Sequence, residues 1–260
     1  MNENECTVEW RHYMNKGKIL EERLQECDVS ITEILDRLKK NVPNICTVVL
    51  YISRFEGVGN KYSDFDIYVI SDQDIQRENY MLKIKGSCCD VEYWSLQQVK
   101  ALINNRHALS EPKTLKFIKR LKLGEVIFNE GNGYYYIKEL IEKVDIDKAI
   151  YDYFKMLANA EYDDAVKMYK NEDYIASLLC CQRSMDNFIA SLNAKNGHGN
   201  LNIKWAPRIF INEQGYGNIR ILDQYMQHRI YCSVDDINIG ETVEKIIDFL
   251  TVELNSFSLF

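Results

Sequence analysis

The segment that decides the fold runs from Ser53 to Asp66 and reads Ser-Arg-Phe-Glu-Gly-Val-Gly-Asn-Lys-Tyr-Ser-Asp-Phe-Asp. It follows a β-branched apolar run, residues 47–52, which is typical of a buried central strand. A second apolar run, residues 67–70, follows Asp66 and predicts another strand. The segment is therefore a glycine-containing turn between two strands, with carboxylates at the start of the second.

Asp64 and Asp66 are two residues apart at the start of this second strand. Successive side chains of a strand alternate between its faces, so both carboxylates are expected on the same side. Two acidic groups on an apolar strand are costly unless a cation compensates them. Clustered oxygen ligands suit Mg²⁺, which keeps several waters and shares phosphate oxygens with a bound nucleotide.

Asp90 and Glu92 repeat this spacing on a third predicted strand, at about residues 87–94. Either could complete a site for two metal ions. Asp90 is favoured as the ligand because its apolar flanks are more like those of Asp66, and the choice stays open. The general base that deprotonates an acceptor is also expected to be a carboxylate, with Glu92, Glu130 and Asp186 as candidates.

The turn itself offers hydroxyl and backbone N–H groups that suit phosphate oxygens, and glycine lets a ligand approach the backbone closely. The residues expected to contact a triphosphate are Ser53, Arg54, Gly57, Gly59 and Ser63.

Together these residues resemble the signature of the polymerase-β-like nucleotidyltransferase superfamily, in which a Gly-Ser pair, a loop and Asp-x-Asp precede a third acidic residue. The likeness is greatest to the small-molecule branch, which includes aminoglycoside nucleotidyltransferases. It implies transfer of a nucleoside monophosphate from a nucleoside triphosphate to a hydroxyl or amine of a small acceptor, with release of pyrophosphate. ATP is the expected donor. Two Mg²⁺ ions would be held by Asp64, Asp66 and Asp90, and the catalytic carboxylates would be these three and Glu92.

Two further positions bear on this resemblance. The family's glycine before the serine is Ile52 here, and an isoleucine there is expected to crowd the triphosphate. Related proteins often carry a Lys-Trp pair in the helical domain, which matches Lys204-Trp205. The resemblance implies that Lys204 contacts the triphosphate as a point charge.

The rest of the chain predicts an α+β protein with two domains. Helical periodicity is expected over residues 16–41, 95–104, 112–121, 146–169 and 174–194. Long helices joined by short loops predict a helical bundle at the C-terminal end. We expect a nucleotidyltransferase domain over residues 1–133, with a small mixed sheet and flanking helices, and a helical substrate-binding domain over residues 134–260.

The composition of the chain limits the classes of protein to which it can belong. The chain has 260 residues, 46% of them hydrophobic, and a net charge of −7, which argues against a dedicated nucleic-acid-binding protein. Its eight cysteines show no metal-binding spacing and predict reduced thiols. No apolar run reaches membrane-spanning length and no secretory signal is recognised, so we expect a cytoplasmic protein without a membrane partner.

Three functions remain open on this basis. The first is modification of a small molecule, either an antibiotic or a biosynthetic intermediate. The second is adenylylation of a partner protein, as in antitoxin-type nucleotidyltransferases. The third is a non-catalytic nucleotide-binding module with the same fold, which Ile52 favours. A homodimer is compatible with each.

Overall fold

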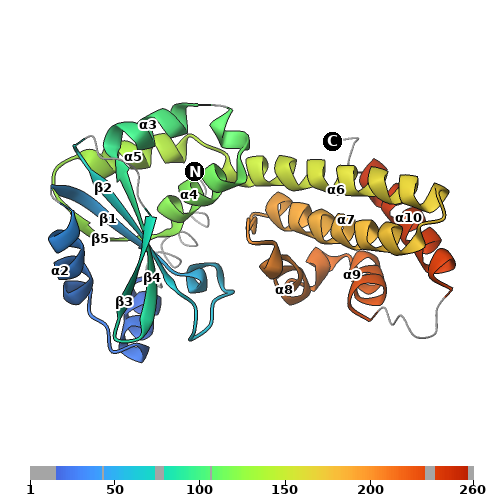
Figure 1. The fold of residues 1–260 in the computed structure, drawn as a ribbon, viewed down its shortest axis with the longest axis horizontal. Helices are drawn as coiled ribbons and strands as arrows, with labels where there is room; N and C mark the ends of the chain where they lie inside the picture. Colours follow the sequence, from blue (N-terminus) through green and yellow to red (C-terminus); the bar gives the residue numbers. More distant parts are fainter. Residues whose placement is uncertain (1–15, 43, 74–78, 106, 232–237, 257–260) are drawn as a thin grey trace, which may run out of the picture. The chain divides into compact units, whose positions relative to one another are not determined.

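The computed structural model describes residues 16–42, 44–73, 79–105, 107–231 and 238–256. The chain divides into two compact units, Met1–Val144 and Asp145–Phe260. The first unit contains a mixed sheet with helices packed on it, and the second is helical (Figure 1). The predicted α+β fold, with a sheet domain followed by a helical domain, is confirmed.

The sheet of the first unit has the strand order β3-β4-β2-β1-β5. Its strands are β1 (Ile45–Tyr51), β2 (Phe65–Ser71), β3 (Asn79–Ile84), β4 (Ser87–Ser95) and β5 (Glu125–Asn129). β2 and β4 are parallel, and the other neighbouring pairs are antiparallel. The three inner strands, β1, β2 and β4, were correctly predicted, whereas the two edge strands were not predicted.

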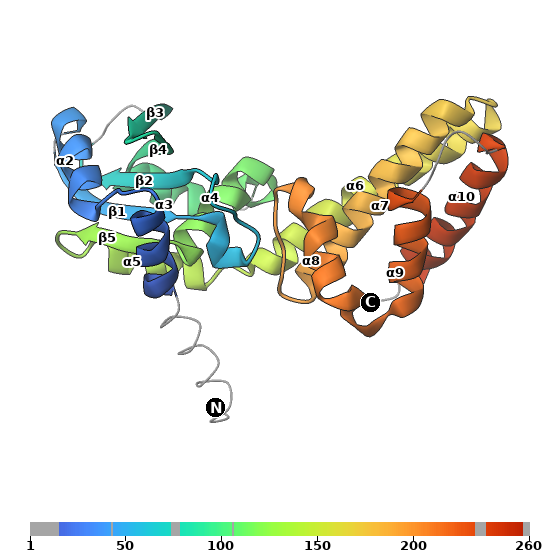
Figure 2. The same ribbon diagram turned by 90° about the horizontal axis from the view of Figure 1, so that it is seen from below.

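Helices cover both faces of this sheet (Figures 1 and 2). On one face lies α4 (Pro112–Leu123), whose Phe117 stacks on Trp94 of β4 with ring centres 4.2 Å apart. α3 (Leu96–Asn104) and α5 (Gly133–Glu142) pack beside it. On the other face, Lys39 of α2 (Ile31–Asn41) lies over the ring of Phe128 of β5.

The helix predicted over residues 16–41 is two helices, which corrects that expectation. Helical residues end at 26, Asp28 adopts a left-handed backbone with φ of 53°, and α2 begins after Ser30. Ser30 and Glu33 form a capping box, in which each side chain accepts from the other's backbone N–H. This local hydrogen bonding stabilises a new helix start inside an otherwise continuous apolar pattern.

The second unit is built on two long helices, α6 (Ile146–Lys170) and α7 (Tyr174–Lys195), both of which the periodicity predicted. They approach closely because small α7 side chains face α6: the hydroxyls of Ser177 and Ser184 donate to the carbonyls of Ala165 and Ala158 at 2.7 and 2.8 Å. The remaining helices are α8 (Ala206–Asn212), α9 (Ile219–Tyr225) and α10 (Ile239–Ser256).

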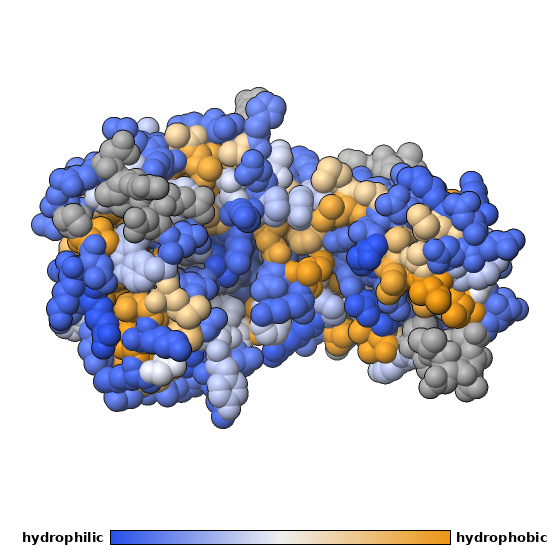
Figure 3. Space-filling model, in the orientation of Figure 1, coloured by the Kyte–Doolittle hydropathy of each residue, from blue (hydrophilic) through white to orange (hydrophobic). Residues whose placement is uncertain are grey.

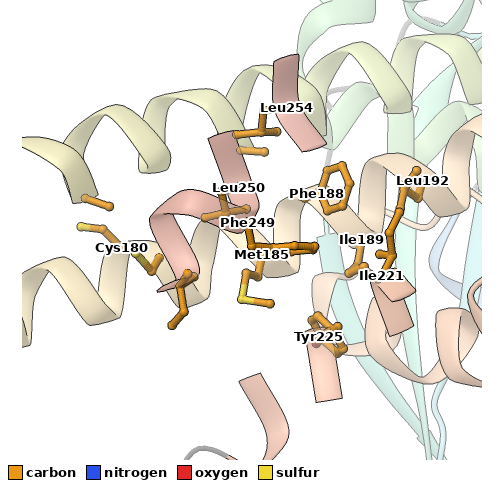
Figure 4. Packing of buried hydrophobic residues seen from close by; sticks show 14 of the residues in the cluster. Cys180, Met185, Phe188, Ile189, Leu192, Ile221, Tyr225, Phe249, Leu250 and Leu254 are labelled. Atoms are coloured by element: carbon orange, nitrogen blue, oxygen red, sulfur yellow. The ribbon is translucent and has the colours of Figure 1, made fainter. Parts of the chain in front are cut away.

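An apolar core joins these helices (Figure 4). Met185, Phe188 and Ile189 of α7 pack in it with Phe249 and Leu250 of α10. Large apolar side chains also reach the surface of this unit, and in the view of Figure 3 they lie in separate patches among hydrophilic ones.

The first unit extends to Val144, whereas the sequence placed the domain boundary after residue 133. The difference is α5, which packs against α3, α4 and β1 of the first unit. In the described residues, no helix is long and apolar enough to cross a membrane. The cysteines of those residues, among them Cys89 and Cys181, are free thiols.

Replacing the helix cap, Ser30→Ala, should lower the free energy of unfolding by about 1 kcal/mol, because it leaves backbone N–H groups of α2 without their acceptor. Urea unfolding followed by circular dichroism measures this. The matched control is Thr32→Ala, an exposed position of the same helix, which should change stability little. Equal stability of the two variants would contradict the role of the cap.

Candidate functional site

The predicted carboxylates lie at one end of the sheet of the first unit. β2 begins at Phe65, so Asp64 lies just before the strand and is exposed, and Asp66 is the strand's second residue. The parallel register with β4 pairs Asp66 with Asp90 and Tyr68 with Glu92. Paired positions of neighbouring strands share a face, so Asp90, and not Glu92, is the carboxylate directly beside Asp66.

Asp66 is held by a residue that the sequence analysis did not single out. Arg120 of α4 forms an ion pair with the Asp66 carboxylate and donates to the Tyr68 hydroxyl at 3.1 Å. Its guanidinium also lies 5.0 Å from the ring centre of Tyr51, at the end of β1. The ion-paired side chains are both only 16% exposed. Arg120 thus contacts three side chains on the sheet face that α4 covers.

A sequence signal for Arg120 did exist. It lies three residues after Phe117 and one before Leu121, both buried, so it falls on the apolar stripe of α4 that faces the sheet. A charged residue on such a stripe requires a buried partner, and Asp66 is the partner that the fold supplies.

The pKa of Asp66 reflects its surroundings. Burial raises it to about 6, and the negative charge of Asp90 adds to this, while Arg120 and Lys116 act in the opposite direction. Burial also lowers the pKa of Lys116. The guanidinium therefore only partly compensates the buried carboxylate, which favours additional positive charge at this position.

The chemistry of the carboxylates fits Mg²⁺, and their arrangement fits it in part. Asp66 and Asp90 supply carboxylate oxygens in register, and no described residue forms a hydrogen bond or an ion pair with the carboxylate of Asp64 or Asp90. Within that same part of the chain, no three His, Cys, Asp or Glu side chains lie close enough together to hold a metal ion. A ligand set of Asp64, Asp66 and Asp90 would require these three carboxylates to lie closer together than they do here.

The turn before the carboxylates is tightly folded around two glycines. Ser53–Glu56 form a 3₁₀ turn, which Gly57 ends in a left-handed conformation with φ of 70°. At Gly59, a Cβ atom would lie 2.6 Å from both the Ser53 hydroxyl and the Arg54 backbone nitrogen. Only glycine permits this contact, so the predicted phosphate-binding turn depends on Gly59 for its closure.

Ile52 directly precedes this turn. Its backbone is extended, with φ of −133° and ψ of 143°, and its side chain is 1% exposed. Any residue adopts such a backbone, and the buried side chain does not crowd the solvent-facing side of the turn. The family glycine is therefore not required by the conformation that this chain adopts.

Two of the predicted phosphate contacts already have structural partners. The Ser63 hydroxyl accepts from the Asn60 backbone N–H at 3.0 Å, which closes the end of the turn. The Arg54 guanidinium donates to both oxygens of Glu26, at 3.0 and 2.7 Å, and Arg23 donates to the Ser63 carbonyl at 2.8 Å. The turn is thus attached to helical residues 16–26. Most of its backbone N–H groups also have acceptors within the turn, among them those of Gly57, Val58 and Tyr62, whereas the Gly59 N–H and the Ser53 hydroxyl have none among the described residues.

The remaining candidates lie outside this cluster. Glu130 follows β5 and is exposed. In the second unit, Lys204 lies exposed in a short 3₁₀ turn, with its ammonium 5.1 Å from the ring centre of Trp205. Asp186 of α7 accepts hydrogen bonds from Tyr225 and Arg229, which gives it a structural role within the helical unit.

Comparison with known proteins shows a likeness of fold. No protein-family model and no curated protein matches the sequence. The structure is similar to the crystal structure of a nucleotidyltransferase-like protein from Exiguobacterium sibiricum, with a TM-score of 0.51 over 86% of this chain and 73% of that chain. The two are 10% identical in sequence, so the comparison shows a nucleotidyltransferase-like fold.

Removing the guanidinium, Arg120→Met, should lower the free energy of unfolding by about 3 kcal/mol at pH 7, because it leaves the Asp66 charge buried without its partner. Urea unfolding measures this effect. Adding Asp66→Asn should restore part of the loss, since the unpaired charge is then absent. The control is Lys122→Met, an exposed basic position of the same helix, with an expected change within about 0.5 kcal/mol. The single variant Asp66→Asn completes the cycle, and a loss in the double variant equal to the sum of the two single losses would show that the pair contributes no coupling.

Proposed function

We propose that this protein is a nucleotidyltransferase, which transfers a nucleoside monophosphate from a nucleoside triphosphate to a hydroxyl or amine of a small molecule. ATP is the proposed donor. The observation that carries the proposal is the register of Asp66 with Asp90, with Asp64 just upstream at the end of a turn closed by Gly59. This arrangement occurs on a nucleotidyltransferase-like fold, and its residues match the family signature. An antibiotic and a biosynthetic intermediate are both acceptors of the required kind.

The proposed roles follow from what each group offers. Mg²⁺ held by Asp64, Asp66 and Asp90 would neutralise phosphate charge and polarise the α-phosphate during in-line displacement. The Gly59 N–H and the Ser53 hydroxyl, which have no other partner among the described residues, bind the phosphates. Glu92, which pairs with Tyr68 on the same sheet face as Asp66 and Asp90, would accept a proton from the acceptor.

A second function is favoured by one observation, the ion pair between Asp66 and Arg120. With its carboxylate bound to a guanidinium, the site could bind a nucleotide without a metal ion and without transferring it. In that protein the cationic side chains of α4, Lys116 and Arg120, would take the place of Mg²⁺ beside the phosphates. The requirement for a divalent cation separates the two functions.

Calorimetric titration with α,β-methylene-ATP tests both. With Mg²⁺ present we expect saturable binding, which Asp64→Asn should weaken at least about tenfold if its carboxylate is a metal ligand. Asp64 is the suitable position because its side chain is exposed, so the fold should be unaffected. The matched control is Asp36→Asn, an exposed carboxylate of α2, which should bind as the unchanged protein does.

The outcomes are distinct. Binding that requires Mg²⁺ and Asp64 supports the transferase and justifies a screen of acceptors for pyrophosphate release. Binding that persists in EDTA and in Asp64→Asn supports the metal-independent nucleotide-binding protein. If no nucleoside triphosphate binds under any condition, both functions are excluded.

Gly59→Ala should also weaken binding of the triphosphate about tenfold or more, because the new methyl group would displace the turn from Ser53 and Arg54. The same titration measures it, with thermal unfolding as a check that the sheet is intact. Gly17→Ala is the control, since a Cβ there meets nothing within 4 Å. Unchanged affinity in Gly59→Ala would show that the turn does not contact the phosphates.

A further inference from the structure

A groove of about 560 Å³ lies within the second unit, between α9 with its continuation and α10. Side chains of Gln224, Gln227 and His228 line one wall, and those of Lys245, Asp248 and Phe249 line the other. The spacing on each wall follows one helical face. The volume is in the range of small-molecule sites.

The first wall contains an unusual backbone feature. After α9 the chain forms a π-helical turn, Met226–Ile230, in which the Tyr231 N–H donates to the Met226 carbonyl at 2.8 Å. Gln227 and His228, which line the groove, belong to this turn. Isolated π turns are rare in helices and frequently occur at functional sites, because they are less stable than α-helix.

The π turn is held in place from the side of α7. Asp186 accepts from the Tyr225 hydroxyl at 2.8 Å, and the Arg229 Nε lies 3.0 Å from each of its carboxylate oxygens. Tyr225 is fully buried and packs in the apolar core (Figure 4). These contacts fix the residues on either side of Gln227 and His228, so the groove wall is rigidly positioned.

The charges of the second wall are available to a ligand. Lys245 and Asp248 are exposed, and in the part of the chain that the structure describes neither side chain forms a hydrogen bond or an ion pair. Arg220, at the groove, is instead paired with the buried Glu253. Burial lowers the pKa of His228, and the nearby Lys245 acts in the same direction, so the imidazole is neutral at pH 7 and bonds to Gln224.

We infer that this groove binds a small zwitterionic molecule of the amino-acid type, with an apolar side chain. Lys245 pairs with its carboxylate, Asp248 pairs with its ammonium, and the apolar part packs on Phe249 and Val252. One positive and one negative side chain, three residues apart on α10, match a ligand that carries both charges close together. The Gln224 and Gln227 amides supply further hydrogen bonds.

The test is an NMR titration of the full chain, with the Gln224 and Gln227 side-chain amides as reporters. The probes are L-phenylalanine, N-acetyl-L-phenylalanine, which lacks the ammonium, and phenethylamine, which lacks the carboxylate. We expect L-phenylalanine to change the chemical shifts of these amides saturably, and we expect N-acetyl-L-phenylalanine and phenethylamine to bind more weakly. Lys245→Gln and Asp248→Asn should each lower the affinity for L-phenylalanine about fivefold, as expected for partly exposed charge pairs.

The variants also separate the two charges. Lys245→Gln should leave phenethylamine binding unchanged, and Asp248→Asn should leave that of N-acetyl-L-phenylalanine unchanged. The controls are Glu244→Gln on α10 and Lys170→Gln on α6, both exposed and outside the groove lining. The inference is overturned if no probe shifts the amides saturably, if the acetylated probe binds as tightly as the amino acid, or if neither substitution changes its affinity. These readouts do not involve Asp64 or nucleotide, so they stand apart from the proposed transferase.

Discussion

The structure of the first unit depends on how the carboxylate of Asp66 is accommodated on a sheet face that a helix covers. Its charge cannot be buried alone, and α4 compensates it with Arg120, whose guanidinium also contacts Tyr68 and Tyr51. The same helix packs its aromatic side chain on Trp94. Charge pairing and apolar packing therefore fix α4 in one place, directly over the strands that carry the candidate site.

The sequence predicted the carboxylate pattern but not its electrostatics. Carboxylates two residues apart on a strand lie on the same face, which is a local property that the sequence reveals. The register between the strands then decides which carboxylates are neighbours. Arg120 is 54 positions from Asp66 in the sequence, and only the packing of α4 on the sheet brings them together. Long-range pairs of this kind are not visible in one sequence, even where a charged residue on an apolar stripe signals that some partner exists.

The fold was predictable where burial is complete. β1 and β2 carry nearly continuous apolar runs because both of their faces are covered, and α6 and α7 have long periodic patterns. β3 and β5 lie at the edges of the sheet and are only partly buried, so their sequences carry a weak apolar signal. The break before α2 was missed although Ser30 and Glu33 have the spacing of a capping box, because the apolar periodicity continues through it.

Positions 52 and 59 differ in how strongly the structure restricts the type of residue that they can hold. At position 52 the backbone is extended and the isoleucine side chain is buried, so the conformation of this chain does not require glycine there. At position 59 no side chain fits between the turn and Ser53. A sequence pattern that requires glycine directly before the serine does not match this chain. A pattern that instead demands glycine six positions after Ser53, followed by Asp-x-Asp, encodes the steric requirement of the loop itself.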